Sequence, residues 1–121
     1  MCIRDRQIIC VMGDGGIQMN LQELQTISRE RIPVKVFVMN NMSLGMIRDL
    51  QTYSNKEYFG SVEGYTTPDF ERVAYAFDIP YTRIAAWEDT GSLDRDLSTN
   101  CPHFFEVVLS PNTHVLPGFA E

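Results

Sequence analysis

A short apolar run over residues 7–12 ends abruptly in the turn Gly-Asp-Gly-Gly at residues 13–16, and this junction constrains the fold more than any other feature. A continuous apolar run closed by glycines is typical of a strand that is buried on both faces. A second run over residues 34–39 is rich in β-branched residues and ends in Asn40-Asn41. The sequence therefore predicts two buried strands that each end in a polar turn.

Helical patterns separate these strands from each other and from two later ones. We expect helices at residues 20–30, 43–53, 68–77 and 89–98, and further strands at 79–85 and 103–109. Strands that alternate with helices favour an α/β fold, in which a parallel sheet carries helices on both faces and right-handed crossovers connect the strands.

Local patterns also predict how the helices begin and what they bury. Asn20 stands three residues before Glu23, which is the spacing of a capping box and predicts that the first helix begins at Asn20. Trp87 is expected to pack at the start of the last helix. The helix over residues 43–53 is expected to bury Leu44, Ile47 and Leu50, or Met46 with Leu50.

Length, charge and cysteine content exclude several classes of protein. A chain of 121 residues fits one domain, and its net charge of -6 argues against nucleic-acid binding. No apolar stretch is long enough for a transmembrane helix, so no membrane association is expected. Three cysteines without a C-x-x-C pair predict free thiols and a reducing cytoplasm.

The first six residues, Met-Cys-Ile-Arg-Asp-Arg, match no pattern in the rest of the chain. They resemble the ends of translated sequencing reads into which adapter sequence has been carried. We therefore expect residues 1–6 to be foreign, residues 7–121 to be part of a single domain, and the natural chain to begin upstream.

Polar side chains come directly after both strands of the predicted βαβ unit. Successive parallel strands end at the same edge of a sheet and lie about 4.8 Å apart, so Asp14 and the pair Asn40-Asn41 should lie close together. Carboxylate and amide oxygens suit Mg²⁺ or Ca²⁺, and glycine backbone N–H groups can cradle a phosphate. Each motif alone would also fit an ordinary solvated turn.

Taken together, the two motifs resemble a known signature. Gly13-Asp14-Gly15, then 24 residues, then Asn40-Asn41 is similar to the binding motif of thiamine-diphosphate (ThDP) enzymes. The flanking segments GDGGIQMNLQELQT, IPVKVFVMNNMSLGMIRDLQ, PDFERVAYAF and PHFFEVVLSP resemble the C-terminal domain of the acetolactate synthase group. The resemblance runs from about Gln7 to Pro117. It implies that residues 7–121 form a Rossmann-like ThDP-binding domain that is truncated at its N-terminus.

The resemblance also implies roles for individual residues. Asp14 and Asn41 would bind Mg²⁺ through side-chain oxygens, and Ser43 through its backbone carbonyl. Gly15 and Gly16 would offer N–H groups to the diphosphate. The full set of cofactor-binding residues would be Gly13, Asp14, Gly15, Gly16, Asn41, Ser43, Leu44, Gly45 and Met46.

For the intact protein, the resemblance implies a ThDP- and Mg²⁺-dependent transferase or lyase that decarboxylates a 2-oxo acid substrate and joins the remainder to a second carbonyl compound. The catalytic glutamate of such enzymes belongs to a different domain, usually of the neighbouring subunit, so no catalytic residue is expected here. We expect this chain alone to be inactive and to bind ThDP weakly or not at all. The intact protein would be a homo-oligomer, at least a dimer, with FAD possible in a middle domain.

Departures from the family pattern leave other functions open. Leu50 stands where many acetolactate synthases carry tryptophan, and the loop from Tyr53 to Tyr65 does not match their sequence. A ThDP decarboxylase or lyase for another substrate class is one alternative. Another is a non-catalytic module that binds a magnesium nucleotide, although the chain lacks the glycine-rich motif and lysine of a P-loop. His103 is expected to be a packed or surface residue, whereas His114 could help to close the site.

Overall fold

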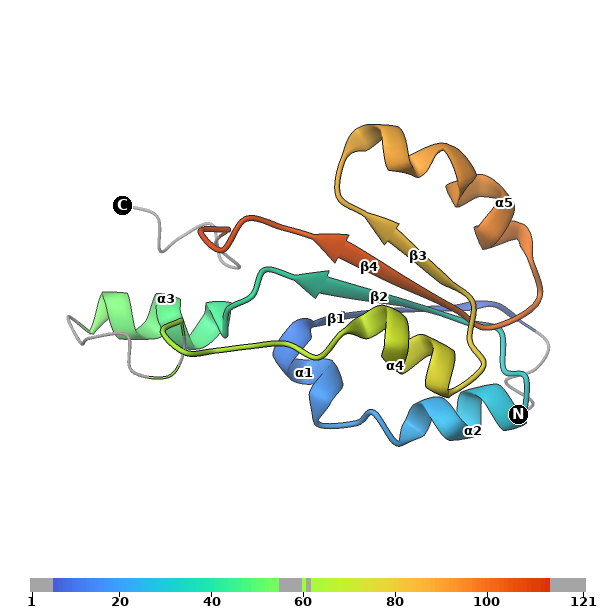
Figure 1. The fold of residues 1–121 in the computed structure, drawn as a ribbon, viewed down its shortest axis with the longest axis horizontal. Coiled ribbons are helices and arrows are strands. Elements are labelled where there is room, and N and C mark those ends of the chain that lie inside the picture. Colours follow the sequence, from blue (N-terminus) through green and yellow to red (C-terminus); the bar gives the residue numbers. More distant parts are fainter. Residues whose placement is uncertain (1–5, 55–59, 61, 114–121) are drawn as a thin grey trace.

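The four strands of the computed structural model are all parallel and form one sheet in the order β1-β2-β4-β3 (Figure 1). The structure describes residues 6–54, 60 and 62–113. The strands are β1 (Ile8–Gly13), β2 (Val34–Asn40), β3 (Tyr81–Ile84) and β4 (His103–Val108). This arrangement confirms the predicted α/β fold.

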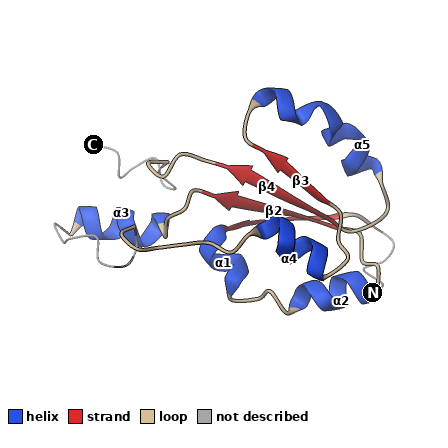
Figure 2. Cartoon of the chain, in the orientation of Figure 1, coloured by secondary structure: helices blue, strands red, loops and turns tan. Residues whose placement is uncertain are grey.

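Helices cover both faces of the sheet, as Figures 1 and 2 show. One face carries α1 (Asp14–Gln18), α2 (Glu23–Arg29) and α4 (Phe70–Ala76), and the other carries the 3₁₀ helix η2 (Trp87–Ser92) and α5 (Leu93–Ser98). The chain advances across the sheet from β1 to β3 and then returns to β4. Because crossovers are right-handed, reversing the direction of travel moves the connecting helices to the opposite face.

The main core lies between the sheet and the face that carries α1, α2 and α4. It consists of buried apolar side chains from all of these elements: Ile17, Leu24, Val36, Val38, Phe70, Ala74, Ile79 and Phe104. Burial of this apolar surface is the main force that fixes the sheet against the three helices. It therefore fixes where β1 and β2 end.

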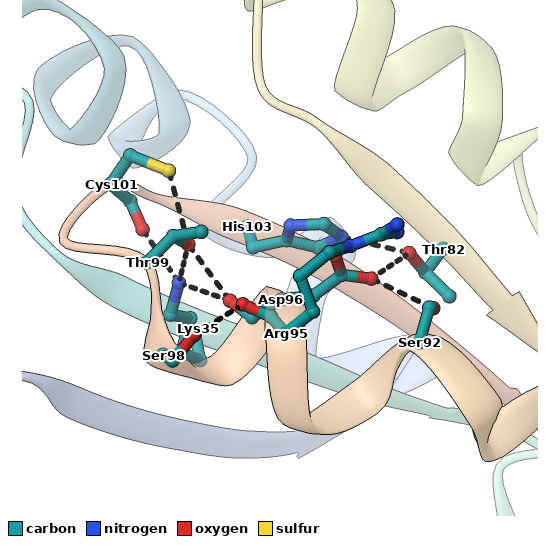
Figure 3. A network of polar contacts seen from close by, with 9 residues as sticks. All are labelled: Lys35, Thr82, Ser92, Arg95, Asp96, Ser98, Thr99, Cys101 and His103. Atoms are coloured by element: carbon teal, nitrogen blue, oxygen red, sulfur yellow. Dashed lines mark hydrogen bonds and ion pairs between the residues drawn. The ribbon is translucent and has the colours of Figure 1, made fainter.

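The opposite face is organised around Lys35, whose side chain is fully buried (Figure 3). Its ammonium group donates hydrogen bonds to the carbonyl oxygens of Asp96 (2.8 Å) and Cys101 (2.9 Å) and to Oγ1 of Thr99 (2.7 Å). These oxygens lie in the last turn of α5 and in the segment directly after it. Lys35 thus holds the end of α5 against the amino-terminal end of β2.

The predicted start of the first helix is wrong. Instead, α1 begins at Asp14, directly after β1, and a separate α2 begins at Glu23 without a side-chain cap. The backbone carbonyl of Asn20, not its side chain, accepts the hydrogen bond from the N–H of Glu23 at 3.0 Å. Backbone turns therefore satisfy the groups that a capping box would have served.

The second helix is present as predicted, but the burial predicted for its apolar side chains is wrong. Helix α3 (Gly45–Tyr53) extends beyond the carboxyl end of β2, away from the sheet (Figure 1). Met46, Ile47 and Leu50 are exposed because no sheet face lies against them, whereas Arg48 and Asp49 are buried. Arg48 donates to the backbone carbonyls of Pro111 and, at 2.8 Å, of Thr113. The apolar stripe of α3 therefore faces outward.

Two further burial predictions fail. Ile9 and Val11 of β1 are each 60% exposed, so this strand is not buried on both faces. The reason is that β1 lies at the edge of the sheet, and the helices of the second face cover the other edge, over β3 and β4. Trp87 begins η2, but it is 85% exposed and does not pack. No helix in the described ranges is long and apolar enough to cross a bilayer.

Candidate metal and diphosphate site

Asp14 lies at the end of β1 as the first residue of α1 and is almost fully buried. Its Oδ1 accepts hydrogen bonds from the backbone N–H of Gly15 at 2.7 Å and from the hydroxyl of Tyr65 at 3.4 Å. Its Oδ2 has no hydrogen-bond partner, and among the described residues it is the sole buried side-chain nitrogen or oxygen in this state. An unpaired buried carboxylate oxygen costs free energy, which a bound cation would recover.

The electrostatic environment of Asp14 agrees with this geometry. Burial raises the pKa of its carboxyl above the ordinary value, and the backbone N–H groups of Gly15, Ser43 and Met42 only partly oppose that rise. Burial therefore makes the charged form of Asp14 more costly than it is in water, and neighbouring hydrogen bonds offset this only in part. A metal ion beside Oδ2 would stabilise the charged form.

The predicted pair Asn40-Asn41 separates into two roles. Asn41 and Ser43 line a cavity next to Asp14, whereas Asn40 ends β2 and turns its side chain inward to Glu106. Met42, which lies between Asn41 and Ser43 in the chain, adopts a positive φ of 52°. This left-handed residue reverses the chain, so that residues 41 and 43 both border the cavity.

The cavity beside Asp14 has a volume of about 700 Å³. All nine residues predicted from the family resemblance border it, which brings together the segments directly after β1 and β2. The structure adds wall residues that the sequence did not indicate, and most of these are apolar: Val11, Met12, Met19, Met39, Ile47, Leu109 and Thr113. Leu109 and Thr113 come after β4, which neighbours β2, so the sheet order explains their presence.

Gly15 allows an unusually close approach of two walls of the cavity. A Cβ atom built at this position would lie 2.5 Å from Cδ2 of Leu44 and 3.3 Å from the hydroxyl oxygen of Tyr65. A side chain would therefore displace Leu44 or block the space in front of the backbone. At Gly13, in contrast, a Cβ would meet nothing within 4 Å.

Tyr65 and Gln18 contact Asp14, and sequence reasoning missed both. Gln18 donates from Nε2 to the hydroxyl of Tyr65 at 3.0 Å and to the carbonyl oxygen of Asp14 at 3.1 Å. Tyr65 lies in the segment that departs from the family pattern, so the resemblance gave no signal for it.

The oxygen atoms around the cavity fit Mg²⁺ better than a soft metal. Asp14 has a carboxylate there, and Asn41 and Ser43, which border the same cavity, carry amide, hydroxyl and carbonyl oxygens of the kind that hard cations prefer. Within the described ranges, no three His, Cys, Asp or Glu side chains gather as a metal cluster. A diphosphate would therefore have to supply further oxygens and charge.

His103 does not border the cavity. His103 opens β4 at the opposite end of the sheet, is buried, and stacks on Phe105 with ring centroids 4.3 Å apart. This confirms its predicted packing role. His114 lies outside the described residues.

Comparison with known proteins identifies the family. Residues 1–107 match the family described as thiamine pyrophosphate enzyme, C-terminal TPP binding domain. Acetolactate synthase 1, chloroplastic, from Zea mays is 34% identical over 118 residues, covering 91% of this chain and 18% of that protein. The acetolactate synthase isozyme 2 large subunit from Escherichia coli is 32% identical over 111 residues, with 91% and 20% covered.

A solved structure supports the same assignment. The thiamine diphosphate-dependent 4-hydroxybenzoylformate decarboxylase of Rhodococcus jostii RHA1 superposes with a TM-score of 0.79 and 28% sequence identity, covering 88% of this chain and 20% of that one. The chain thus spans about one fifth of the length of these relatives. It belongs to the thiamine pyrophosphate enzyme family and corresponds to the C-terminal, TPP-binding domain of acetolactate synthase-like enzymes.

Proposed function

We propose that this chain is the magnesium- and diphosphate-binding part of a ThDP enzyme that decarboxylates a 2-oxo acid and transfers the remainder to a second carbonyl compound. The observation that carries the proposal is the unpartnered Oδ2 of buried Asp14 beside a cavity bordered by Asn41 and Ser43. A structural carboxylate would be expected to have its oxygens satisfied. The Oδ2 atom of Asp14 is instead available to bind a ligand.

Each residue has a definite part in the proposed site. Asp14, the side chain of Asn41 and the carbonyl of Ser43 hold Mg²⁺, and the backbone N–H of Gly16 faces the diphosphate. The N–H of Gly15, which the sequence also assigned to the diphosphate, donates to Oδ1 of Asp14 instead and so orients the metal-binding carboxylate. The apolar walls exclude water from the bound cofactor, which strengthens each of these electrostatic contacts. The cofactor, when bound, supplies the electron sink that allows a 2-oxo acid to lose CO₂.

Other parts of the proposal concern the intact protein. We propose that turnover requires residues outside this chain, that residues 1–6 are foreign, and that the intact enzyme is at least a dimer. FAD in a further domain belongs to the same proposal. The thiols of Cys10 and Cys101 are free, which supports a reducing compartment, and we propose the cytoplasm.

The metal site can be tested on the chain itself with Mn²⁺, which accepts the same oxygen ligands as Mg²⁺ and broadens nearby NMR signals even at low occupancy. With millimolar ThDP present, Mn²⁺ should broaden the amide signals of Gly15 and Ser43, and excess Mg²⁺ should reverse the effect. Asp14→Ala should abolish the broadening. Asp69→Ala, the same substitution at an exposed aspartate, should not. Equal broadening in wild type and Asp14→Ala would refute the proposal.

A second candidate is a ThDP decarboxylase for another substrate, since the solved relative is a 4-hydroxybenzoylformate decarboxylase. Both enzymes would use the same metal site, so product analysis of the intact enzyme with several 2-oxo acids would distinguish them. A module that binds a magnesium nucleotide would instead give equal or stronger Mn²⁺ broadening with ADP than with ThDP.

A further inference from the structure

Glu106 is a buried carboxylate in the middle of the sheet that does not border the cavity. Its two oxygens accept hydrogen bonds from two neighbouring strands. Oε1 accepts from Nδ2 of Asn40 on β2 at 2.6 Å, and Oε2 accepts from the hydroxyl of Tyr81 on β3. Unlike the carboxylate of Asp14, this one has a partner on each oxygen, so it has no free position for a ligand.

Asn40 links the Glu106 carboxylate to the loop of residues 41–43, which borders the cavity. Its Oδ1 accepts a hydrogen bond from the backbone N–H of Met42 at 3.2 Å, and its carbonyl oxygen accepts from the N–H of Leu109 at 2.8 Å. Met42 is the residue with positive φ, a conformation that non-glycine residues rarely adopt without support. The hydrogen bond from the N–H of Met42 to the Asn40 side chain closes a local turn and so stabilises this conformation.

The orientation of Asn40 depends on Glu106. An amide side chain can exchange its oxygen and nitrogen by rotation, and only one of the two orientations presents Oδ1 to Met42. Glu106 accepts hydrogen bonds but donates none when ionised, so it selects the orientation in which Nδ2 faces it. Tyr81 holds the other oxygen of Glu106, and burial together with the nearby carboxylate raises the pKa of Tyr81, so its hydroxyl keeps its proton.

We infer that Glu106 and Tyr81 are positioning residues for the metal site and that they act through Asn40 on Met42. This inference rests on the proposed function. The hydrogen bonds run from β3 through β4 to β2 and end at the loop that presents Asn41 and Ser43. Partners behind metal ligands typically contribute about 10- to 100-fold to metal affinity.

A polarity swap between Asn40 and Glu106 tests the inference. In Asn40→Asp, two carboxylates face each other, and the loop should lose its support. In the double variant Asn40→Asp with Glu106→Gln, the hydrogen bond is restored in the opposite sense, because the new amide donates to the new carboxylate. The double variant also retains the net charge and an acceptor for Tyr81, and the aspartate still accepts from Met42.

Two measurements read the effect. The first is amide hydrogen exchange at Met42 in the metal-free chain, which should be about 10-fold or more faster in Asn40→Asp and return to the wild-type rate in the double variant. The second is the Mn²⁺ concentration that half-broadens Gly15 in the presence of ThDP. It should rise by about 10-fold in Asn40→Asp and recover in the double variant.

A matched control separates positioning from general destabilisation. Thr82→Val removes the hydroxyl that contacts His103 at 2.9 Å in the network on the other face. It should lower stability but change neither Met42 exchange nor Mn²⁺ affinity. If Asn40→Asp leaves exchange at Met42 unchanged, or if the double variant fails to restore it, the inference is wrong. If Mn²⁺ broadens Gly15 equally in the wild type and in Asp14→Ala, the proposed function fails. The exchange data at Met42, which need neither metal nor ThDP, then still show whether Glu106 orders the loop.

Discussion

Lys35 and Asp14 are both buried charged residues that lie at opposite ends of the sheet. They differ in whether hydrogen-bond partners satisfy their charged groups. The ammonium group of Lys35, at the amino-terminal end of β2, donates to three oxygens, from Asp96, Thr99 and Cys101 (Figure 3). The carboxylate of Asp14, at the carboxyl end of β1, leaves Oδ2 without a partner.

The difference separates a structural charge from a ligand-binding one. Burial lowers the pKa of Lys35, but its three acceptors compensate the lost hydration, so the residue connects β2 to α5. Burial raises the pKa of Asp14, and hydrogen bonds from neighbouring groups offset that rise only in part, while Oδ2 lacks a partner. Loss of charge should therefore destabilise the fold at one end of the sheet and stabilise it at the other.

The largest effect is expected at Lys35. Lys35→Met keeps the length of the side chain but leaves three buried oxygens without a donor, so the free energy of unfolding should fall by about 3 kcal/mol. Urea denaturation followed by circular dichroism measures this. Arg29→Met, at an exposed ion pair with Glu30, is the control and should change stability by no more than about 0.5 kcal/mol. A comparable small change at Lys35 would contradict its structural role.

The next effect is expected at the ligand end of the sheet. In Gly15→Ala the new methyl group would meet Leu44 at 2.5 Å, and the strain should lower the free energy of unfolding by about 1–2 kcal/mol. Gly13→Ala has open space and serves as the matched control. Adding Leu44→Ala to Gly15→Ala should relieve the overlap. Equal stability of the two glycine variants would show that the close approach to Leu44 is unimportant.

Asp14→Asn should have the opposite sign. The uncharged amide removes an unpaired buried charge, so the free energy of unfolding at neutral pH should rise by about 1 kcal/mol while metal binding is lost. The folded-state pKa of Asp14 lies above the ordinary value of 3.8. Between pH 3.8 and that raised pKa, the folded wild type therefore binds more protons than the unfolded chain. The advantage of the variant should therefore shrink as the pH falls through that range. Thermal unfolding across this range tests it, and a loss of stability at neutral pH would contradict our interpretation of Asp14.

The smallest effect concerns His103, near Lys35. Burial lowers the pKa of His103 below 6.5, although the Asp96 carboxylate opposes this. The unfolded chain then binds more protons between the lowered pKa and 6.5, so stability should fall as the pH drops through that window. His103→Gln should flatten this part of the profile by less than about 1 kcal/mol between about pH 7.5 and pH 5.5. An unchanged slope would show that His103 does not titrate differently in the folded state.

Much of the carboxyl end of the sheet was predictable because its signals are local. The apolar runs ending in glycine and asparagine located β1 and β2, and parallel strands have to bring Asp14 and Asn41 to one edge. The burial of individual side chains was less predictable. Ile9, Val11 and the stripe on α3 are exposed because nothing in the described part of the chain covers them, and an apolar pattern contains no information about its partner.

The sequence by itself determined the strand–turn signature, its spacing and hence the family and nine of the residues that border the cavity. Only the tertiary structure decided how the polar groups are paired. Asn40 meets Glu106 across 66 positions and Lys35 meets Thr99 across 64, and such partners depend on strand order and side-chain direction. A hydrogen bond needs both atoms within about 3.5 Å, which packing of the sheet and helices fixes. Packing therefore decided that Asn40 supports the loop while Asn41 faces the site, and that Asp14 keeps one oxygen free.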